Sequence, residues 1–294
     1  MPLPQRILAI AGPRENETGW AANLFWFRLF VLLHMAGRSF LSVRVPEYDA
    51  WLHQLLLHAL VVVGLARLVP RLSLWASRLA ALLVVAQIAI TMPFTANHVF
   101  LELLCLGLLA LLDESKQDED ELLLVAIRWL SAVFFFYTGL QKVLWGRYFD
   151  GQLLGYLTAT EDRFAWFFQH VIPTAEFERL RAIGPPRAGA GPYRVDSLLF
   201  LAVSNGVYVF EMLAGVLLLV SRTRWMAAIA AIGFVIMVEL GAREIIFGAL
   251  MINLLLLFVP GQWNKKLFGA FVAFYLYLCL ANRMAAVPMF SYSL

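Results

Sequence analysis

The stretch that decides the fold is LLLVAIRWLSAVFFFYTGLQKVLW, residues 122–145, in which Arg128 and Lys142 are the charged residues. An apolar run of about 20 residues is long enough to cross the hydrocarbon core of a bilayer. Similar runs recur along the chain, so the sequence predicts an all-α, polytopic transmembrane helix bundle of about 8–9 spans. We predict spans at 23–42, 50–69, 76–95, 98–112, 122–145, 198–220, 225–241, 244–259 and 266–282, of which the fourth, seventh and eighth are short for a full crossing.

The composition supports a membrane protein and argues against several soluble classes. Of 294 residues, 62% are hydrophobic and 15% are charged, whereas soluble domains carry about a quarter charged residues. A net charge of +3 indicates no nucleic-acid surface. Cys105 and Cys279 lie far apart inside apolar runs, which predicts neither a metal site nor a disulfide. We expect one transmembrane domain over residues 1–294.

The orientation in the membrane follows from the arginines and lysines of short loops, which favour the cytoplasmic side. The N-terminal tail and the loops after spans two, six and eight share one side under this span count, and Arg38 and Arg44 oppose the trend. We therefore expect an integral, multi-pass protein with a cytoplasmic N-terminus and with His98 and residues 146–197 facing outward. The loop residues are Arg67, Arg71, Arg78, Arg222, Arg224, Lys265 and Lys266.

Three segments outside the spans have distinctive compositions. FAWFFQHVI, residues 164–172, is an apolar aromatic patch that we expect on the membrane interface. The Pro/Gly-rich stretch 184–192 cannot be a regular helix and predicts a loop. The acidic run 113–121 predicts a solvated loop.

Lys142 is the sharpest functional candidate, because a charge inside a span is costly and marks a functional site by default. Two interpretations stay open. The ammonium can reach the headgroups from the outer end of span five, as snorkelling lysines do. Alternatively, the amine is partly desolvated, and desolvation disfavours the ammonium and makes a lysine usable as a base.

His98, beside Asn97, lies at the outer start of span four, on the same predicted membrane face as Lys142. Two titratable groups at one depth predict an acid–base pair in an outward-opening cavity, with Tyr137 and Trp145 as wall residues. Arg128 lies about 21 Å along the helix from Lys142, at 1.5 Å per residue, and is expected to be structural. The acidic residues inside spans are expected to face the bundle interior, paired or protonated, and Arg243 and Glu244 to pair with each other. All are expected to be structural rather than catalytic; the acids are Glu102, Glu211 and Glu239.

A resemblance to a known family rests on RWLSAVFFFYTGLQKVLWGRYFDGQLLGYL, residues 128–157. This run resembles the signature of the vitamin K-dependent γ-carboxylase-like superfamily, which includes the bacterial horizontally transferred transmembrane (HTTM) domain. Residues 22–38, Asn97–His98, 211–225 and 258–263 resemble other parts of that family, so the likeness covers most of 20–265. The signature residues are Arg128, Gly139, Lys142, Trp145, Asp150, Gly151, Tyr156 and Leu157.

The resemblance implies a specific chemistry. A lysine at the position of Lys142 acts as base on reduced vitamin K, which O2 oxidises, and a histidine at the position of His98 supports carboxylation of a glutamate. The cofactor implied is a reduced, vitamin K-like quinone, and no metal is implied. This chain departs from the pattern, because Gln141-Lys142 replaces a double lysine and Glu239 lies in a late span that often holds a histidine. The chain ends soon after span nine, so we expect no large lumenal domain.

Three functions are therefore open. The first is a membrane enzyme that uses Lys142 and His98 on a lipophilic quinol-like molecule. The second is a non-catalytic membrane partner in maturation of, or immunity to, a secreted peptide. The third, a transporter, is least supported, because no sequence repeat is visible. Expected partners are membrane lipid, a lipophilic small molecule and a secreted peptide, without nucleic acid. The expected pocket or supporting residues are Asn97, Tyr137, Gly139, Trp145, Glu211, Glu239 and Arg243.

Overall fold

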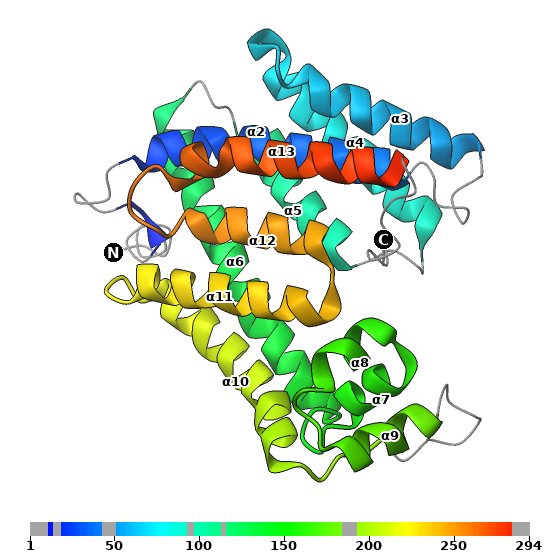
Figure 1. The fold of residues 1–294 in the computed structure, drawn as a ribbon. Helices are drawn as coiled ribbons and strands as arrows, with labels where there is room; N and C mark the ends of the chain where they lie inside the picture. Colours follow the sequence, from blue (N-terminus) through cyan, green and yellow to red (C-terminus); the bar gives the residue numbers. More distant parts are fainter. Residues whose placement is uncertain are drawn as a thin grey trace. The chain divides into compact units, whose positions relative to one another are not determined.

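A computed structural model describes residues 11–13, 19–42, 51–92, 97–112, 116–183 and 193–283, and this part of the chain is all-α (Figure 1). It forms 12 α-helices and one short 3-10 helix, η2 (Pro70–Leu72). The α-helices are α2 (Trp20–Ser42), α3 (Trp51–Ala66), α4 (Ser73–Thr91), α5 (Asn97–Leu111), α6 (Gln117–Trp145), α7 (Gln152–Thr160), α8 (Asp162–Phe168), α9 (Thr174–Ile183), α10 (Leu198–Leu219), α11 (Arg224–Ala242), α12 (Ile245–Leu256) and α13 (Trp263–Arg283).

In the part of the chain that the structure describes, five helices are long and apolar enough to cross a membrane, namely α2, α4, α6, α10 and α11. Helices α3, α5 and α12 are apolar but shorter, as expected for the fourth and eighth predicted spans. The seventh predicted span, 225–241, is longer than expected, because α11 begins at Arg224 and ends at Ala242 and so has 19 residues. These helices indicate an integral multi-pass membrane protein. Which side each loop faces stays a prediction.

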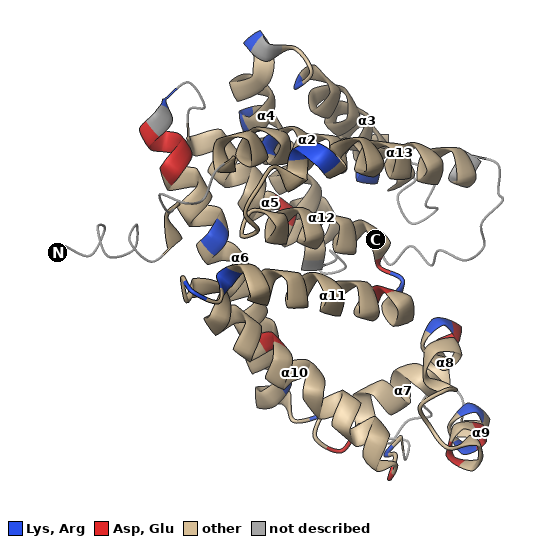
Figure 2. Cartoon of the chain, turned by 60° about the vertical axis from the view of Figure 1, so that its left-hand side comes forward, with Lys and Arg blue, Asp and Glu red and all other residues tan. Residues whose placement is uncertain are grey.

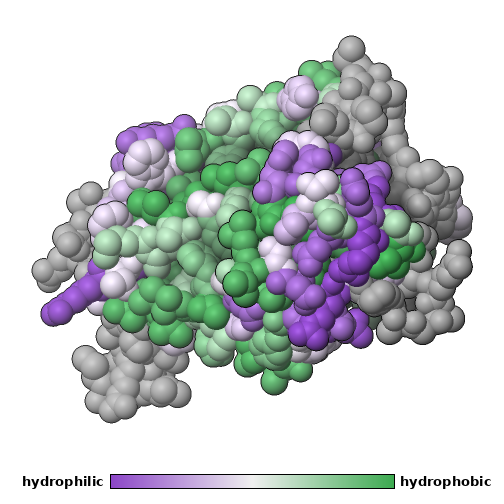
Figure 3. Space-filling view, turned by 60° about the horizontal axis from the view of Figure 1, so that its bottom comes forward, coloured by the Kyte–Doolittle hydropathy of each residue, from purple (hydrophilic) through white to green (hydrophobic). Residues whose placement is uncertain are grey.

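Charged residues are sparse along the long helices and gather on short helices such as α8 and α9 (Figure 2). Large apolar side chains instead cover much of the surface, as a space-filling view shows (Figure 3). A water-soluble protein rarely exposes such extended apolar area, whereas a lipid-facing surface requires it. The surface therefore agrees with the apolar helices.

The chain divides into two compact units, and each is described by itself. The first comprises the described parts of Met1–Trp129 and Glu244–Leu294, and the second comprises those of Leu130–Arg243. Helix α6 contributes its first half to one unit and its second half to the other. Compact units within one chain are not evidence of separate domains, so the single domain over residues 1–294 stays a prediction.

Helix α2 is the central element of the first unit and contacts α3, α5, α12 and α13. Its inward face includes Phe27, Leu32 and Met35, all fully buried. Gly64 of α3 lies so close to α2 that an added Cβ would be 2.6 Å from the Leu32 carbonyl oxygen. A glycine is therefore needed for the close approach of these two helices.

Arg128 has the structural role expected from the sequence. Its guanidinium is buried in the first unit and donates to the carbonyl oxygen of Leu257 from Nε at 3.1 Å and from Nη2 at 2.7 Å. Nη1 donates to the carbonyl oxygens of Ala11 at 3.0 Å and Gly12 at 3.2 Å. Because the last carbonyls of a helix lack partners within that helix, Arg128 caps the end of α12 and holds the N-terminal segment against it.

The acidic run is helical over its described second half, which corrects the predicted loop. Helix α6 begins at Gln117, and Asp118, Glu119 and Asp120 form its first turn. Negative side chains at this end are stabilised by the helix dipole. Asp120 also accepts a hydrogen bond from Arg28 at 2.5 Å, which fixes the start of α6 to α2. Residues 113–115 and 184–192 lie outside the described residues.

The aromatic stretch 164–172 is partly buried within the second unit, and its place on the membrane interface stays a prediction. Phe168 and Ile172 are buried in a core that α7, α8 and α9 build with the start of α10, and Trp166 is the aromatic residue of this stretch that is exposed. Phe168 packs edge-on against Phe200 of α10, with ring centroids 5.1 Å apart. Part of the stretch is therefore buried by its own neighbouring helices.

Candidate functional site

Lys142 forms an ion pair with Glu211 in the second unit. Its Nζ lies 2.8 Å from Oε1 and 2.7 Å from Oε2 of Glu211, and the two side chains are 20% and 10% exposed. Lys142 is in the last turn of α6, and Glu211 is in the middle of α10. The Lys142 amine is thus held against a carboxylate. It has a counter-ion that neither interpretation from the sequence included.

Two glycines allow α6 and α10 to approach closely at this pair. A Cβ added at Gly139 would lie 2.7 Å from Met212 Cγ and 2.8 Å from the Tyr208 carbonyl oxygen. A Cβ at Gly215 would lie 2.7 Å from the Ala132 carbonyl oxygen. Gly139 precedes Lys142 by about one helical turn, and Gly215 follows Glu211 by about one turn. Small residues at both positions therefore set the separation across which Lys142 reaches Glu211.

The turn after α6 covers one side of the pair. Gly146 and Gly151 have φ values of 68° and 71°, which favour glycine, and the Tyr148 ring centroid lies 5.6 Å from Lys142 Nζ. Ser204 Oγ of α10 donates to the Tyr148 carbonyl oxygen at 2.7 Å. Burial, and then the Glu211 carboxylate, raises the pKa of the Tyr148 phenol, so it stays protonated at neutral pH.

Tyr148 is not among the site residues that the sequence predicts. The resemblance included the segment around it only as a spacer between the lysine and the Asp150-Gly151 pair. A signal was available, because two glycines flank a short aromatic segment directly after a span with a charged last turn. Such a segment predicts a turn that folds back over the helix end.

His98 lies in the first unit and is 7% exposed. Its ring centroid lies 6.4 Å from that of Phe247, and its Nε2 has no hydrogen-bond partner among the described residues. His98 and Lys142 thus belong to different units, so their proximity in one cavity stays a prediction. Within its own unit, His98 precedes Glu102 by one turn on α5 and lies on the same face of that helix.

Glu102 is the centre of a buried polar network. Arg38 donates to Glu102 from Nε at 2.8 Å and from Nη2 at 3.0 Å, and Nη2 also donates to Gln87 Oε1 at 3.0 Å. His34 Nε2 lies 3.5 Å from Glu102 Oε2, while its Nδ1 lies 2.5 Å from the Tyr275 hydroxyl. The network confirms that Glu102 is paired inside the bundle. It also explains why Arg38 opposes the loop-charge trend, since Arg38 is a buried partner rather than a loop residue.

The other expected site residues have varied positions. Tyr137 and Trp145 are 54% and 75% exposed, so their place in a cavity wall stays a prediction. Asn97 begins α5, and its side chain is not described. Glu239 lies in the last turn of α11, where its carbonyl oxygen accepts from the Arg243 N–H at 2.9 Å. Arg243 ends α11 with φ 55°, and its guanidinium lies 5.3 Å from the Trp166 ring centroid.

Comparison with models of known protein families, with curated proteins and with solved structures gives no match.

Proposed function

We propose that this chain is a multi-pass membrane enzyme of the γ-carboxylase-like superfamily, in which Lys142 handles protons for a lipophilic quinol-like molecule. The observation that carries the proposal is the Lys142–Glu211 pair between two candidate spans. A buried ion pair is often no more stabilising than apolar residues of similar volume, because both charges lose their hydration. The presence of the Lys142–Glu211 pair between two apolar helices therefore favours a chemical role over a purely structural one.

The donor set fits a phenolic ligand. Transfer of one proton from the Lys142 ammonium to the Glu211 carboxylate yields a neutral amine and a neutral acid, and low dielectric surroundings favour uncharged forms. The amine can then accept a proton from a hydroxyl group that reaches it. Tyr148 covers one side of the amine and limits the access of water. A bound quinol would supply the acidic hydroxyl and the reducing equivalents.

The test is turnover by purified protein in lipid nanodiscs, measured as O2 uptake with vitamin K hydroquinone as the probe. Lys142→Met should abolish uptake while the protein stays folded, because methionine keeps most of the apolar stem. Lys142→Arg should also fail, because a guanidinium stays protonated and cannot act as a base. Lys265→Met, the same change at an exposed lysine, is the control. Full uptake by Lys142→Arg would contradict the proposal.

A second candidate function is a non-catalytic membrane partner for a secreted peptide. It is favoured by one observation, which is that both carboxylate oxygens of Glu211 already lie within hydrogen-bond distance of the ammonium. The double variant Lys142→Glu/Glu211→Lys separates the two functions. It keeps an ion pair at the crossing but moves the amine to α10. A structural pair tolerates this exchange, whereas a catalytic amine does not.

The proposed orientation places the N-terminus and the α3–α4 turn in the cytoplasm and residues 146–197 outside, because of the loop arginines and lysines. Single cysteines at Arg71 and at Gln169 would test it in a variant whose Cys105 and Cys279 are replaced by alanine. Both positions are exposed. A membrane-impermeant thiol reagent applied to intact cells should label the cysteine at 169 and leave that at 71 unlabelled. The reverse pattern would overturn the orientation.

A further inference from the structure

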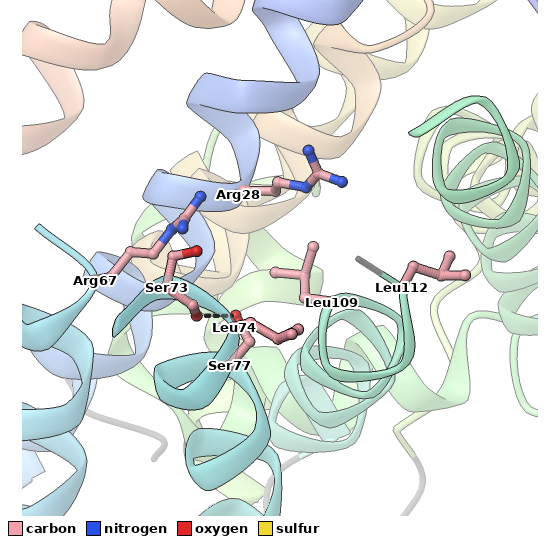
Figure 4. Close-up of a pocket in the computed structure, with 7 residues that line it drawn as sticks. All are labelled: Arg28, Arg67, Ser73, Leu74, Ser77, Leu109 and Leu112. Carbon is pink, nitrogen blue, oxygen red and sulfur yellow. Dashed lines mark hydrogen bonds between the residues drawn. The ribbon is translucent and has the colours of Figure 1, made fainter. Parts of the chain in front are cut away.

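Buried polar side chains gather at more than one place in the first unit. One place is a hollow where α2, the α3–α4 turn and the end of α5 meet, with Arg28 and Arg67 on its lining (Figure 4). Both arginines are engaged within the protein, since Asp120 accepts from Arg28 at 2.5 Å and Arg67 also has a partner. Another place is the network around Glu102, where His34 Nε2 is buried and makes no hydrogen bond among the described residues. The structural role of the network leaves this nitrogen unused.

Tyr275 of α13 is held against α2 at a glycine. A Cβ added at Gly37 would lie 2.6 Å from Tyr275 Cδ1 and 3.1 Å from Cε1, so the aromatic ring occupies the space that a side chain would need. Gly37 follows His34 by about one helical turn, and the seated ring brings its hydroxyl to 2.5 Å from His34 Nδ1. The two rings meet edge-on, with centroids 5.7 Å apart. The Tyr275 hydroxyl is thus fixed on one ring nitrogen of His34.

The other ring nitrogen of His34 faces Glu102 of α5. His34 Nε2 lies 3.5 Å from Glu102 Oε2, and contacts of this kind are often long at rest and shorten during proton transfer. Arg38 donates to both oxygens of Glu102, at 2.8 Å and 3.0 Å, which is the geometry of an ionised carboxylate. Because a carboxylate has only acceptors, the nitrogen that faces it carries the ring proton. His34 is therefore the Nε2–H tautomer, and the Tyr275 hydroxyl donates to Nδ1.

A hydroxyl, an imidazole and a carboxylate thus follow one another in a fixed order. This is the order in which proton-transfer triads are built, with the carboxylate orienting the imidazole and the imidazole accepting from the hydroxyl. Tyr275 is 8% exposed, whereas His34 and Glu102 are fully buried. The hydroxyl of Tyr275 is therefore the end of the chain at which a proton enters or leaves.

We propose that Tyr275, His34 and Glu102 form a proton relay in the interior of the first unit. A proton from water or from a hydroxylated ligand binds the Tyr275 oxygen, the hydroxyl passes its own proton to His34 Nδ1, and His34 passes its Nε2 proton to Glu102. One proton enters and one is stored on Glu102, while Tyr275 and His34 end neutral, and the reverse steps release it. Carboxylates and histidines inside membrane bundles mark such relays. The relay is independent of the Lys142–Glu211 pair and holds whether or not the chain is an enzyme.

Arg38 keeps its acceptors when Glu102 stores the proton. Arg38 Nη2 also donates to Gln87 Oε1 of α4 at 3.0 Å, and a protonated carboxyl group still has an oxygen that accepts. The relay also gives a reason for an ion pair in the bundle interior, since apolar residues of similar volume are often as stable. The two charges hold the His34 proton in line with its acceptor.

The experiment measures how fast the His34 Nε2 proton exchanges with heavy water, by nitrogen NMR of isotopically labelled histidine in the full chain in lipid bilayers. The signal is assigned by its absence in His34→Gln. Tyr275→Phe keeps the ring and removes the hydroxyl, so it should slow the exchange about a hundredfold, the lower end of what a positioned acid–base group contributes to proton transfer. Tyr277→Phe is the matched control, because Tyr277 is an exposed tyrosine of the same helix. It should leave the exchange rate unchanged.

The spectrum and the rates test the relay separately. The His34 spectrum should show the proton on Nε2, and a proton on Nδ1 instead would refute the direction of the chain. Equal exchange rates in the natural protein and in Tyr275→Phe, or no exchange in the natural protein, would overturn the relay.

Backbone amide exchange of α2 around His34 is recorded in the same samples, because a variant that loosens the bundle speeds both kinds of exchange. Imidazole exchange that follows amide exchange in every variant would assign it to opening of the helices and refute the relay. If Tyr275→Phe does not fold, the natural protein decides the question. Imidazole exchange faster than that of the buried α2 amides supports the relay, and exchange no faster than theirs refutes it.

Discussion

Arg38 of α2 donates two hydrogen bonds to Glu102 of α5, and neither side chain is more than 2% exposed. Loss of either partner leaves the other charge buried alone. We therefore expect Glu102→Gln to lower the free energy of unfolding by about 3–5 kcal/mol. Chemical unfolding in mild detergent, with Glu121→Gln at an exposed acid as control, measures the loss.

The double variant Arg38→Met/Glu102→Leu refines that test. It removes both charges together and should recover most of the stability, because a buried pair is often no better than apolar residues. A double variant as unstable as Glu102→Gln would mean that the charges themselves are needed.

Gly139→Ala should destabilise the α6–α10 crossing. The new Cβ would lie 2.7–2.8 Å from Met212 Cγ and the Tyr208 carbonyl oxygen, so the helices must separate. Gly206→Ala on α10 is the control, since nothing lies within 4 Å of its added Cβ. The control should be neutral or more stable by up to about 1 kcal/mol, the helix preference of alanine over glycine. Thermal unfolding compares the two, and equal melting temperatures would argue against a close crossing.

Arg128→Met should lower the free energy of unfolding by about 3 kcal/mol or more, because it removes hydrogen bonds from a charged donor to three carbonyl oxygens. Arg128→Lys keeps the charge but offers a single nitrogen. Its free energy of unfolding should therefore lie between those of Arg128→Met and the natural protein. Protection of α12 amides against hydrogen exchange reports the same contact locally. Unchanged protection at Leu254–Leu257 would contradict the capping role.

Tyr148 predicts a pH dependence in the alkaline range. Its pKa in the folded protein is raised above the ordinary value of about 10, so the folded state holds this proton more tightly than the unfolded state. Below a pH of about 10 both states are protonated, so the phenol adds no pH dependence to the stability. As the pH rises further, the unfolded chain ionises first, and the stability that the neutral phenol contributes is lost. Tyr148→Phe should show a smaller fall in melting temperature above this pH, and an identical fall would exclude Tyr148 as its source.

The positions of the helices were predictable from the sequence, because they depend on local composition. The predicted span 98–112 corresponds to α5 (Asn97–Leu111), and 225–241 corresponds to α11 (Arg224–Ala242). An apolar run between charged or turn-forming residues contains most of the information needed for such a helix.

The partners of the charged residues were not predictable in the same way. Lys142 and Glu211 are 69 positions apart in sequence, and Arg38 and Glu102 are 64 apart. The sequence indicates that each buried charge needs a counter-ion, but the choice depends on which helices are neighbours. The burial of Phe168 and Ile172 was not predictable for a related reason, since composition alone does not separate a face against lipid from a face against neighbouring helices.

The Arg38–Glu102 pair also imposes an order on biosynthesis. The ribosome makes α2 before α5, and at about 5–20 residues per second the acid follows the arginine by several seconds. During that interval a fully inserted α2 would hold an uncompensated guanidinium in hydrocarbon. We therefore expect α2 to stay near the translocon, or at the bilayer surface, until α5 emerges. On this expectation, the membrane insertion of α2 and α5 is a joint event of helices separated in the chain, rather than a series of independent steps.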